Sequence, residues 1–316
     1  NTVNLNFSKE LKGVAEGHVE GYQIKDEKAL RYTARLYKIE EAGRTNEAVA
    51  KDLVTLFLAE FTAQEETLKT LKLAPAKRIG VWDKQGVAPL GVDRMVVEAM
   101  HRTTMGVDHD YRNILLHAFR TSLADGWGGS MIATDISDIL FGTPAPILGQ
   151  ANLGVIKEDM VNIVVHGHEP SMSEMLVAAS QDPEIIAYAK AAGTNGIQLS
   201  GICCTANEIL MRQGIPAAGN FLHQELAILT GAVEAMVVDV QCIMQALVGL
   251  AQNFHTVIIT TSPKVKIKGA THIEFDEHKA LTIAKEILKV AIDNFKNRES
   301  VKVRIPQIKE DLIPGF

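Results

Sequence analysis

The chain has 316 residues and a formal net charge of −6; hydrophobic residues make up 47% of it, charged residues 22% and aromatic residues 5%. This composition is typical of a globular protein, the length predicts two domains, and a negative charge spread along the chain argues against a basic groove for nucleic acid. No apolar run is long enough for a membrane span, and none has the flanks of a signal peptide.

The chain contains three cysteines, Cys203, Cys204 and Cys242. An odd number with two adjacent is a poor disulfide framework, so we expect a reducing compartment, the cytoplasm. The chain opens at Asn1 without an initiator methionine and stops at Pro314-Gly315-Phe316 without a tail. We therefore expect an internal section of a longer protein.

The first half of the chain has the apolar spacing of helices. The predicted helices cover residues 9–15, 27–37, 49–57, 93–100 and 111–124. The glycines of the segment 126–129 are predicted to stop the last of these helices as a tight turn. Beyond residues 136–148, Gly142 and two prolines lead into a different pattern.

The second half alternates between short apolar runs and helical stretches. The runs are residues 161–165, 196–199, 235–240 and 256–259, and the helical stretches are 171–192, 205–213, 222–230 and an amphipathic stripe along 280–295. Unbroken apolar runs suit strands that are covered on both faces, and strand–helix alternation predicts a parallel, doubly wound sheet. We therefore predict an α/β protein, with an N-terminal helical domain of residues 1–150 followed by a Rossmann-like parallel-sheet domain of residues 151–316.

Potential metal ligands follow three of the predicted strands. The first strand runs into His166-Gly167-His168, the second into Cys203-Cys204, and the third into Cys242. Because ligands of open parallel sheets bind at the carboxyl ends of the strands, all these side chains are expected at one edge. Imidazole and thiolate bind zinc, nickel and iron–sulfur centres, although lone buried cysteines and structural histidines remain the alternative. Without a CxxC spacing, the residues alone do not identify the metal.

Other candidate groups are weaker. No glycine-rich phosphate loop follows any strand, so a nucleotide is not supported. His101, His109 and His117 recur every eight residues and do not share one helix face, so we expect solvated or capping histidines. Asp125, like its acidic neighbours downstream, is either a proton relay or a helix-end carboxylate.

Several long phrases resemble nickel–iron carbon monoxide dehydrogenases, and the resemblance runs over essentially the whole chain. They are SLADGWGGS (122–130), SDILFGTP (137–144), NLGV (152–155), VHGHEP (165–170), GICCT (201–205), NE (207–208) and VQCI (240–243).

The resemblance implies a nickel–iron–sulfur cluster with one iron outside its cubane-like core. His168 and Cys204 would then hold the outlying iron, Cys242 would hold an iron of the core, and Cys203 would be an alternative thiolate. The implied reaction interconverts CO and water with CO2, two protons and two electrons. Asp125 would support the centre or relay protons beside it.

The resemblance also implies partners and missing parts. A ferredoxin-like electron acceptor, a homodimer and an acetyl-CoA synthase partner are expected of the parent enzyme. Further 4Fe-4S clusters and the remaining cluster ligands would belong to parts of the parent that this chain does not include. Two alternatives stay open: a hybrid-cluster-type hydroxylamine reductase and a metal-free, non-catalytic fragment.

Overall fold

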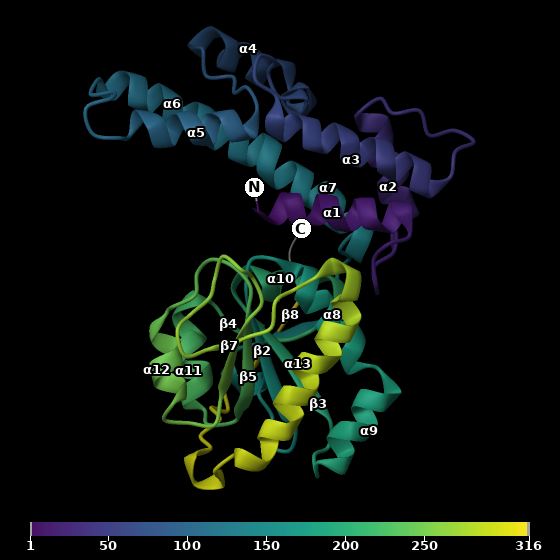
Figure 1. Cartoon of the computed structure of the whole chain (residues 1–316), viewed down its shortest axis with the longest axis vertical. Coiled ribbons are helices and arrows are strands. Elements are labelled where there is room, and N and C mark those ends of the chain that lie inside the picture. The colour runs from purple at the N-terminus through teal and green to yellow at the C-terminus, as the bar shows by residue number, and fades with distance from the viewer. Residues whose placement is uncertain (1, 315–316) are drawn as a thin grey trace. The chain divides into compact units, whose positions relative to one another are not determined.

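Figure 1 shows the computed structural model of the chain, which describes residues 2–314. The chain divides into two compact units. The first ends at Thr143 and the second begins at Pro144, and the short segment Val19–Gly21 belongs to the second.

The first unit is helical. It contains α1 (Thr2–Glu16), α2 (Glu27–Leu36), α3 (Asn46–Thr62), the 3-10 helix η1 (Lys69–Leu73), α4 (Ala76–Gln85), α5 (Val92–Arg102), α6 (Tyr111–Ala124), the π-helix η2 (Asp125–Ser130) and α7 (Met131–Phe141). Helix α1 packs against α3 and α7, and α5 packs along α6 (Figure 1).

Local sequence explains where these helices begin. The side chains of Asp26, Thr45 and Asp110 accept hydrogen bonds from backbone N–H groups in the first turns of α2, α3 and α6. The apolar face of α3 is buried at Leu53 and Phe57, which have no exposed surface. Side-chain caps therefore set the start of these three helices, and an apolar stripe sets the buried face of α3.

The glycine segment 126–129 does not stop helix α6, so the predicted tight turn is wrong. The backbone continues through η2 directly into α7. A Cβ atom on Gly128 would lie 2.6 Å from Val92 and 3.0 Å from Leu68, which real Cβ atoms avoid. The glycine thus permits close packing inside a continuous helix, and the edge contact between Trp82 and Trp127 covers the same region.

The second unit is built on an eight-stranded sheet. Its strands are β1 (Gly149–Ala151), β2 (Val161–Gly167), β3 (Ile197–Ile202), β4 (Ala217–Gly219), β5 (Val233–Val238), β6 (Val257–Thr260), β7 (Thr271–His272) and β8 (Glu310–Leu312), in the order β7-β6-β5-β2-β3-β4-β1-β8. All pairs are parallel except β1 with β8. The order reverses direction between β2 and β5, and ligands of such sheets bind outside the carboxyl ends of the strands at this point.

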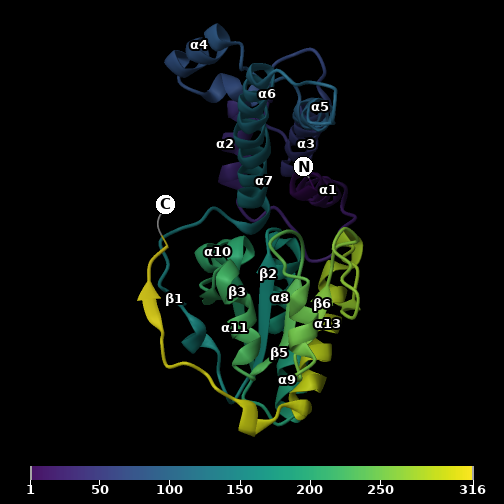
Figure 2. The same ribbon diagram turned by 90° about the vertical axis from the view of Figure 1, so that its left-hand side faces the viewer.

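Helices cover both faces of this sheet. They are α8 (Pro170–Ser180), α9 (Pro183–Ala191), α10 (Cys203–Gln213), α11 (Gln224–Leu229), α12 (Ala246–Ala251) and α13 (Ala280–Asn294), with the 3-10 turns η3 (Leu153–Val155), η4 (Phe221–His223), η5 (Glu277–Lys279), η6 (Phe295–Asn297) and η7 (Ser300–Lys302). In Figures 1 and 2, α11 and α12 lie on one side of the sheet, and α8, α9 and α13 lie on the other. Strand β2 is buried along its whole length. This burial on both faces accounts for its unbroken apolar run.

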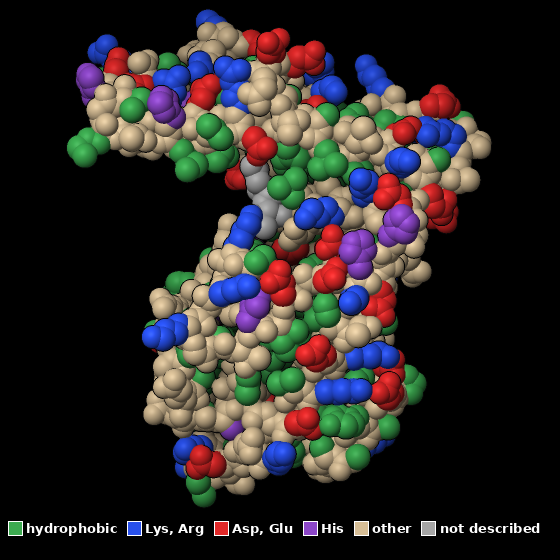
Figure 3. Space-filling view, in the orientation of Figure 1, with side chains coloured by type: hydrophobic (Ala, Val, Ile, Leu, Met, Phe, Trp, Pro, Cys, Tyr) green, Lys and Arg blue, Asp and Glu red, His purple; other side chains and the backbone are tan. Residues whose placement is uncertain are grey.

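The predicted fold class is confirmed, because helices are followed by a mostly parallel sheet with helices on both faces. Among the described residues, no helix is both long and apolar enough to cross a membrane. Lysine and arginine side chains are interspersed with aspartate and glutamate over the visible surface of each unit (Figure 3).

Candidate metal centre

The register of three neighbouring strands brings the predicted ligand segments side by side. His166 on β2 pairs with Ile202 on β3 and with Val238 on β5. The residues that follow are therefore Gly167-His168, Cys203-Cys204 and the loop that ends at Cys242. A parallel bridge between Gly167 and Cys203 extends this pairing beyond the strands.

The side chains of His168 and Cys242 approach each other at this edge. Cys242 Sγ lies 3.8 Å from His168 Nε2. All three cysteines carry free thiols, with Cys204 and Cys242 exposed and Cys203 half-buried. Nδ1 of His168 is buried and has no hydrogen-bond partner within residues 2–314. The edge thus presents an imidazole and several thiols, which is a donor set suited to soft transition metals.

The backbone of this edge is held in an unusual conformation. Cys203, Gln241 and Cys242 have positive φ angles of 66°, 59° and 52°. Each such residue costs about 1–3 kcal/mol, and such residues cluster where function requires a particular geometry. The strain therefore coincides with the thiols identified from the sequence.

The thiols influence one another electrostatically. Burial raises the pKa of Cys203, the negative charges of Cys242, Cys204 and Asp239 add to this effect, and together they bring the pKa to about 11. Burial also raises the pKa of Cys204, with added repulsion from Cys242 and Glu208. Thiolates crowded in this way are stabilised by a bound cation, so metal binding would be coupled to loss of the thiol protons.

The histidine pair is divided between two roles. His166 was expected at the edge with His168, but its side chain has no exposed surface. Its Nε2 atom lies 3.1 Å from Gln224 Oε1 and 3.2 Å from the Cys242 carbonyl oxygen, and Gln224 Nε2 donates to the same carbonyl at 3.3 Å. His166 and Gln224 therefore brace the strained backbone of Cys242. Burial lowers the pKa of His166, which favours the neutral ring.

A buried carboxylate that the sequence analysis did not single out lies behind the edge. Asp239 follows β5 directly and is 8% exposed. Its oxygens accept hydrogen bonds from the backbone of His168 and Glu169 and from the hydroxyl of Thr205. Burial raises the pKa of Asp239 to about 7 against the opposing effect of these hydrogen bonds. A charged residue that interrupts an apolar strand run was the sequence signal for this site.

The residue types at this edge are ones that bind iron–sulfur clusters. Within residues 2–314, no three His, Cys, Asp or Glu side chains converge in a way that would hold one metal ion. The ligands of a cluster bind different metal atoms and do not converge on one point. Exposed thiols, an orphaned imidazole nitrogen and strained cysteine backbones agree with this arrangement.

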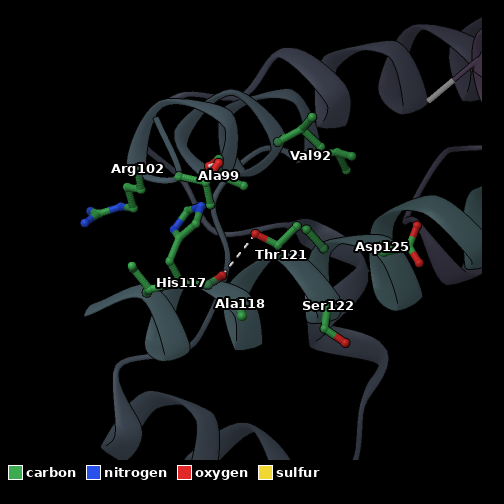
Figure 4. Close-up of a pocket in the computed structure, with 12 residues that line it drawn as sticks. Val92, Ala99, Arg102, His117, Ala118, Thr121, Ser122 and Asp125 are labelled. Carbon is green, nitrogen blue, oxygen red and sulfur yellow. Dashed lines mark hydrogen bonds between the residues drawn. The ribbon is translucent and has the colours of Figure 1, made fainter. Parts of the chain in front are cut away.

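Asp125 lies in the helical unit, on η2, and its side chain is exposed. It lines a pocket of about 620 Å³ between α5 and α6, together with Val92, Ala99, Ser122 and His117 (Figure 4). The predicted relay role of Asp125 stays a prediction.

His117 is not the solvated or capping residue that its spacing predicted. The residue is only 3% exposed, and its Nε2 atom lies 2.9 Å from the carbonyl oxygen of Met95. Its Nδ1 atom lies 3.5 Å from a carboxylate oxygen of Glu98. The imidazole therefore joins α6 to α5 in the wall of the pocket.

Comparisons with known proteins identify the family. The profile described as Prismane/CO dehydrogenase family matches residues 3–316. Carbon monoxide dehydrogenase 1 of Methanosarcina mazei is 52% identical over 306 residues, which cover 97% of this chain and 49% of the relative. The carbon monoxide dehydrogenase/acetyl-CoA synthase subunit beta of Moorella thermoacetica is 42% identical, with 97% of this chain and 46% of the relative covered.

A solved structure shows the same likeness in three dimensions. The nickel-free carbon monoxide dehydrogenase of Thermococcus sp. AM4 superposes with a TM-score of 0.97 at 51% identity, which covers 100% of this chain and 50% of that one. The chain thus spans about half the length of the relatives that it matches.

Proposed function

Because the chain belongs to the Prismane/CO dehydrogenase family, we propose that it is a section of an anaerobic nickel–iron carbon monoxide dehydrogenase and supplies part of the protein shell of the active-site cluster. The observation that carries this proposal is the approach of His168 and Cys242 beside Cys203 and Cys204, in a chain 52% identical to a carbon monoxide dehydrogenase.

Each residue at the edge has a proposed role. His168 and Cys204 bind the outlying iron, and Cys242 binds an iron of the cluster core. Cys203 is the alternative thiolate. It is half-buried, and its backbone pairs with Gly167 beside His168. When bound, the cluster would supply the redox centre at which CO and water are converted to CO2, two protons and two electrons.

The protein groups around the edge prepare it for this cofactor. His166 and Gln224 hold the Cys242 carbonyl, so the thiol is presented from a defined backbone position. Such supporting contacts typically change metal affinity 10–100-fold. Asp125, an exposed residue of the helical unit, is proposed to support the centre or to relay protons.

The parent enzyme is proposed to be a homodimer that passes electrons to a ferredoxin-like acceptor. Similarity to the Moorella thermoacetica subunit supports an acetyl-CoA synthase as a further partner. The remaining cluster ligands, and the further 4Fe-4S clusters of the electron path, would come from regions of the relatives that this chain does not match.

The test is metal analysis of the protein purified without oxygen, combined with CO-dependent reduction of a viologen dye. Nickel, iron and sulfide in the sample, together with dye reduction, are the expected result. A protein that contains neither nickel nor iron after anaerobic purification would contradict the proposal.

A matched pair of substitutions tests the ligand assignment. Cys242→Ser is expected to remove most of the bound metal, because a core thiolate is lost. Cys203→Ser, also at a residue with positive φ, is expected to retain most of it. Equal metal content in both variants would contradict the assignment of these two thiols. Asp125→Asn is expected to keep the metal and lower the turnover rate.

A further inference from the structure

We propose that Asp239 is a positioning residue that holds the turn carrying His168 and the helix carrying Cys204 in fixed relative places, so that both side chains reach the same metal centre. The inference rests on the proposed function and adds a residue that binds no metal itself.

Asp239 joins three segments through one carboxylate. Oδ1 accepts from the backbone N–H of His168 at 2.7 Å and from the N–H of Val240. Oδ2 accepts from the N–H of Glu169 at 3.2 Å and from Thr205 Oγ1 at 2.9 Å. The donors lie on the turn between β2 and α8, on the first turn of α10, and on the loop after β5.

These contacts connect the proposed ligands almost directly. His168 is itself a donor, Thr205 follows Cys204, and Asp239 precedes Cys242 by three positions in the loop. Hydrogen bonds to a charged acceptor are roughly twice as strong as neutral ones. A single carboxylate can therefore fix the relative positions of three segments that are far apart in the sequence.

Gly167 shows how closely the turn approaches this carboxylate. A Cβ atom built on Gly167 would lie 1.8 Å from Asp239 Oδ1. The residue also has φ +142°, a conformation that L side chains rarely adopt. The glycine between the two histidines therefore leaves the space that the Asp239 carboxylate occupies.

The four donors to Asp239 among the described residues are all neutral groups. A carboxylate whose main task is stability is normally buried with a cationic partner, because desolvation of an isolated charge is costly. Neutral donors on three separate segments instead orient those segments relative to one another. Loss of such a supporting contact typically weakens metal binding 10–100-fold without changing the ligands.

The experiment compares Asp239→Asn with Glu234→Gln in the protein as it occurs in the cell, purified without oxygen. Glu234 is a fully buried carboxylate near the start of β5, the strand that Asp239 follows, and it pairs with Arg298 and His255. Both substitutions turn a buried carboxylate into an amide. The measurements are nickel and iron per chain, the electron paramagnetic resonance spectrum of the reduced protein, and the free energy of unfolding.

We expect Asp239→Asn to lower the metal content and to shift the spectrum of the cluster that remains. Glu234→Gln should lower the free energy of unfolding but leave the metal content per folded chain and the spectrum unchanged. Unchanged metal content and spectrum in Asp239→Asn would overturn the inference while the proposed function stands. Absence of both metals from the unsubstituted protein would overturn the proposed function, and the inference with it.

Thr205→Val provides a second test in case Asp239→Asn does not fold. It removes one donor, Thr205 Oγ1, and leaves the carboxylate and its three backbone donors in place. The spectrum should shift in the same direction as in Asp239→Asn, by a smaller amount. A spectrum identical to that of the unsubstituted protein would overturn the inference.

Discussion

A buried carboxylate lies at each end of strand β5, and the two carboxylates have different kinds of partner. Glu234, near the start of β5, lies 2.6 Å from Arg298 and 2.8 Å from His255, and it also accepts from the backbone of Asn162 at 2.6 Å. Asp239, just after the end of β5, accepts hydrogen bonds within the described part of the chain only from backbone N–H groups and one hydroxyl.

The two carboxylates therefore have different proposed roles. Glu234 stabilises the fold, and Asp239 positions the proposed metal ligands. At the amino end, a cation neutralises the carboxylate and ties the C-terminal part of the chain to the sheet, since Arg298 also donates to the carbonyl groups of Met160 and Ala232. At the carboxyl end, Asp239 lies beside three thiols and has no cationic partner within residues 2–314. Active sites tolerate such uncompensated groups because the geometry they impose is useful.

Arg298→Met is expected to have the largest effect on stability. It removes the cation from Glu234 and leaves a fully buried carboxylate without its main partner. Breaking a buried ion pair from one side costs about 3–5 kcal/mol in the free energy of unfolding. Chemical denaturation measures this loss, and the metal content per folded chain should not change.

The matched control is Lys289→Met in the same unit. Its ion pair with Glu184 spans 2.9 Å, but both side chains are well exposed. Such pairs contribute less than about 1 kcal/mol. If the two substitutions lowered the free energy of unfolding equally, or if Arg298→Met removed the metal, the proposed division between the two ends of β5 would be wrong.

Gly167→Ala tests the carboxyl end of β5 without replacing Asp239 itself. The added methyl group would overlap Asp239 Oδ1, and the backbone conformation is unfavourable for alanine. Overpacking together with the conformational strain should cost about 2–4 kcal/mol. We expect lower metal content as well, because the turn that carries His168 must move.

Gly193→Ala is the control that separates backbone strain from steric overlap with Asp239. Gly193 has φ +85°, but no atom lies within 4 Å of a Cβ built there. The substitution should therefore cost only about 1 kcal/mol. Metal content that fell equally in both glycine variants would show that the space beside Asp239 is not what matters at Gly167.

Much of the sheet could be predicted because burial on both faces leaves a direct trace in the sequence. The apolar runs correspond to β2, β3, β5 and β6, and the amphipathic stripe corresponds to α13. The predicted helix 171–192 is instead two helices, α8 and α9, divided where Asp182 caps the second and Pro183 begins it. The glycine segment 126–129 misled because its close packing depends on contacts with distant residues.

The position of the candidate ligands at one edge of the sheet could be predicted from the sequence, but the residues that support them could not. Strand ends placed the histidine pair and all three cysteines at one edge of the sheet, and the family resemblance singled out His168, Cys204 and Cys242 among them. Asp239 acts through residues 34 to 71 positions away, and that pairing exists only in the folded chain. The contact between His166 and Gln224 could not be predicted for the same reason, because the two residues lie 58 positions apart.

Asp135 extends the comparison to the helical unit and carries the smallest expected effect. Its carboxylate accepts a hydrogen bond from the Tyr37 hydroxyl at 3.1 Å, and burial raises its pKa from 3.8 to about 6. A raised pKa means that the folded chain binds more protons than the unfolded chain between these values. The wild-type free energy of unfolding therefore decreases as pH rises from about 4 to about 6, by at most about 3 kcal/mol.

Asp135→Asn should abolish this decrease, so that the variant gains about 1–3 kcal/mol on the wild type between pH 4 and pH 7.5. Asp182→Asn should show the opposite change: its free energy of unfolding should fall relative to the wild type as pH rises. The hydrogen bond from Lys285 lowers the pKa of Asp182, so the stability that Asp182 contributes is present at neutral pH and disappears as pH falls through its folded pKa. Denaturation of both variants at several pH values checks the pair. The quantity to compare is the difference in free energy of unfolding between each variant and the wild type. If this difference changed with pH in the same direction for both variants, a carboxylate with a neutral donor would behave like one paired with a cation. The contrast between Asp239 and Glu234 would then have no physical basis.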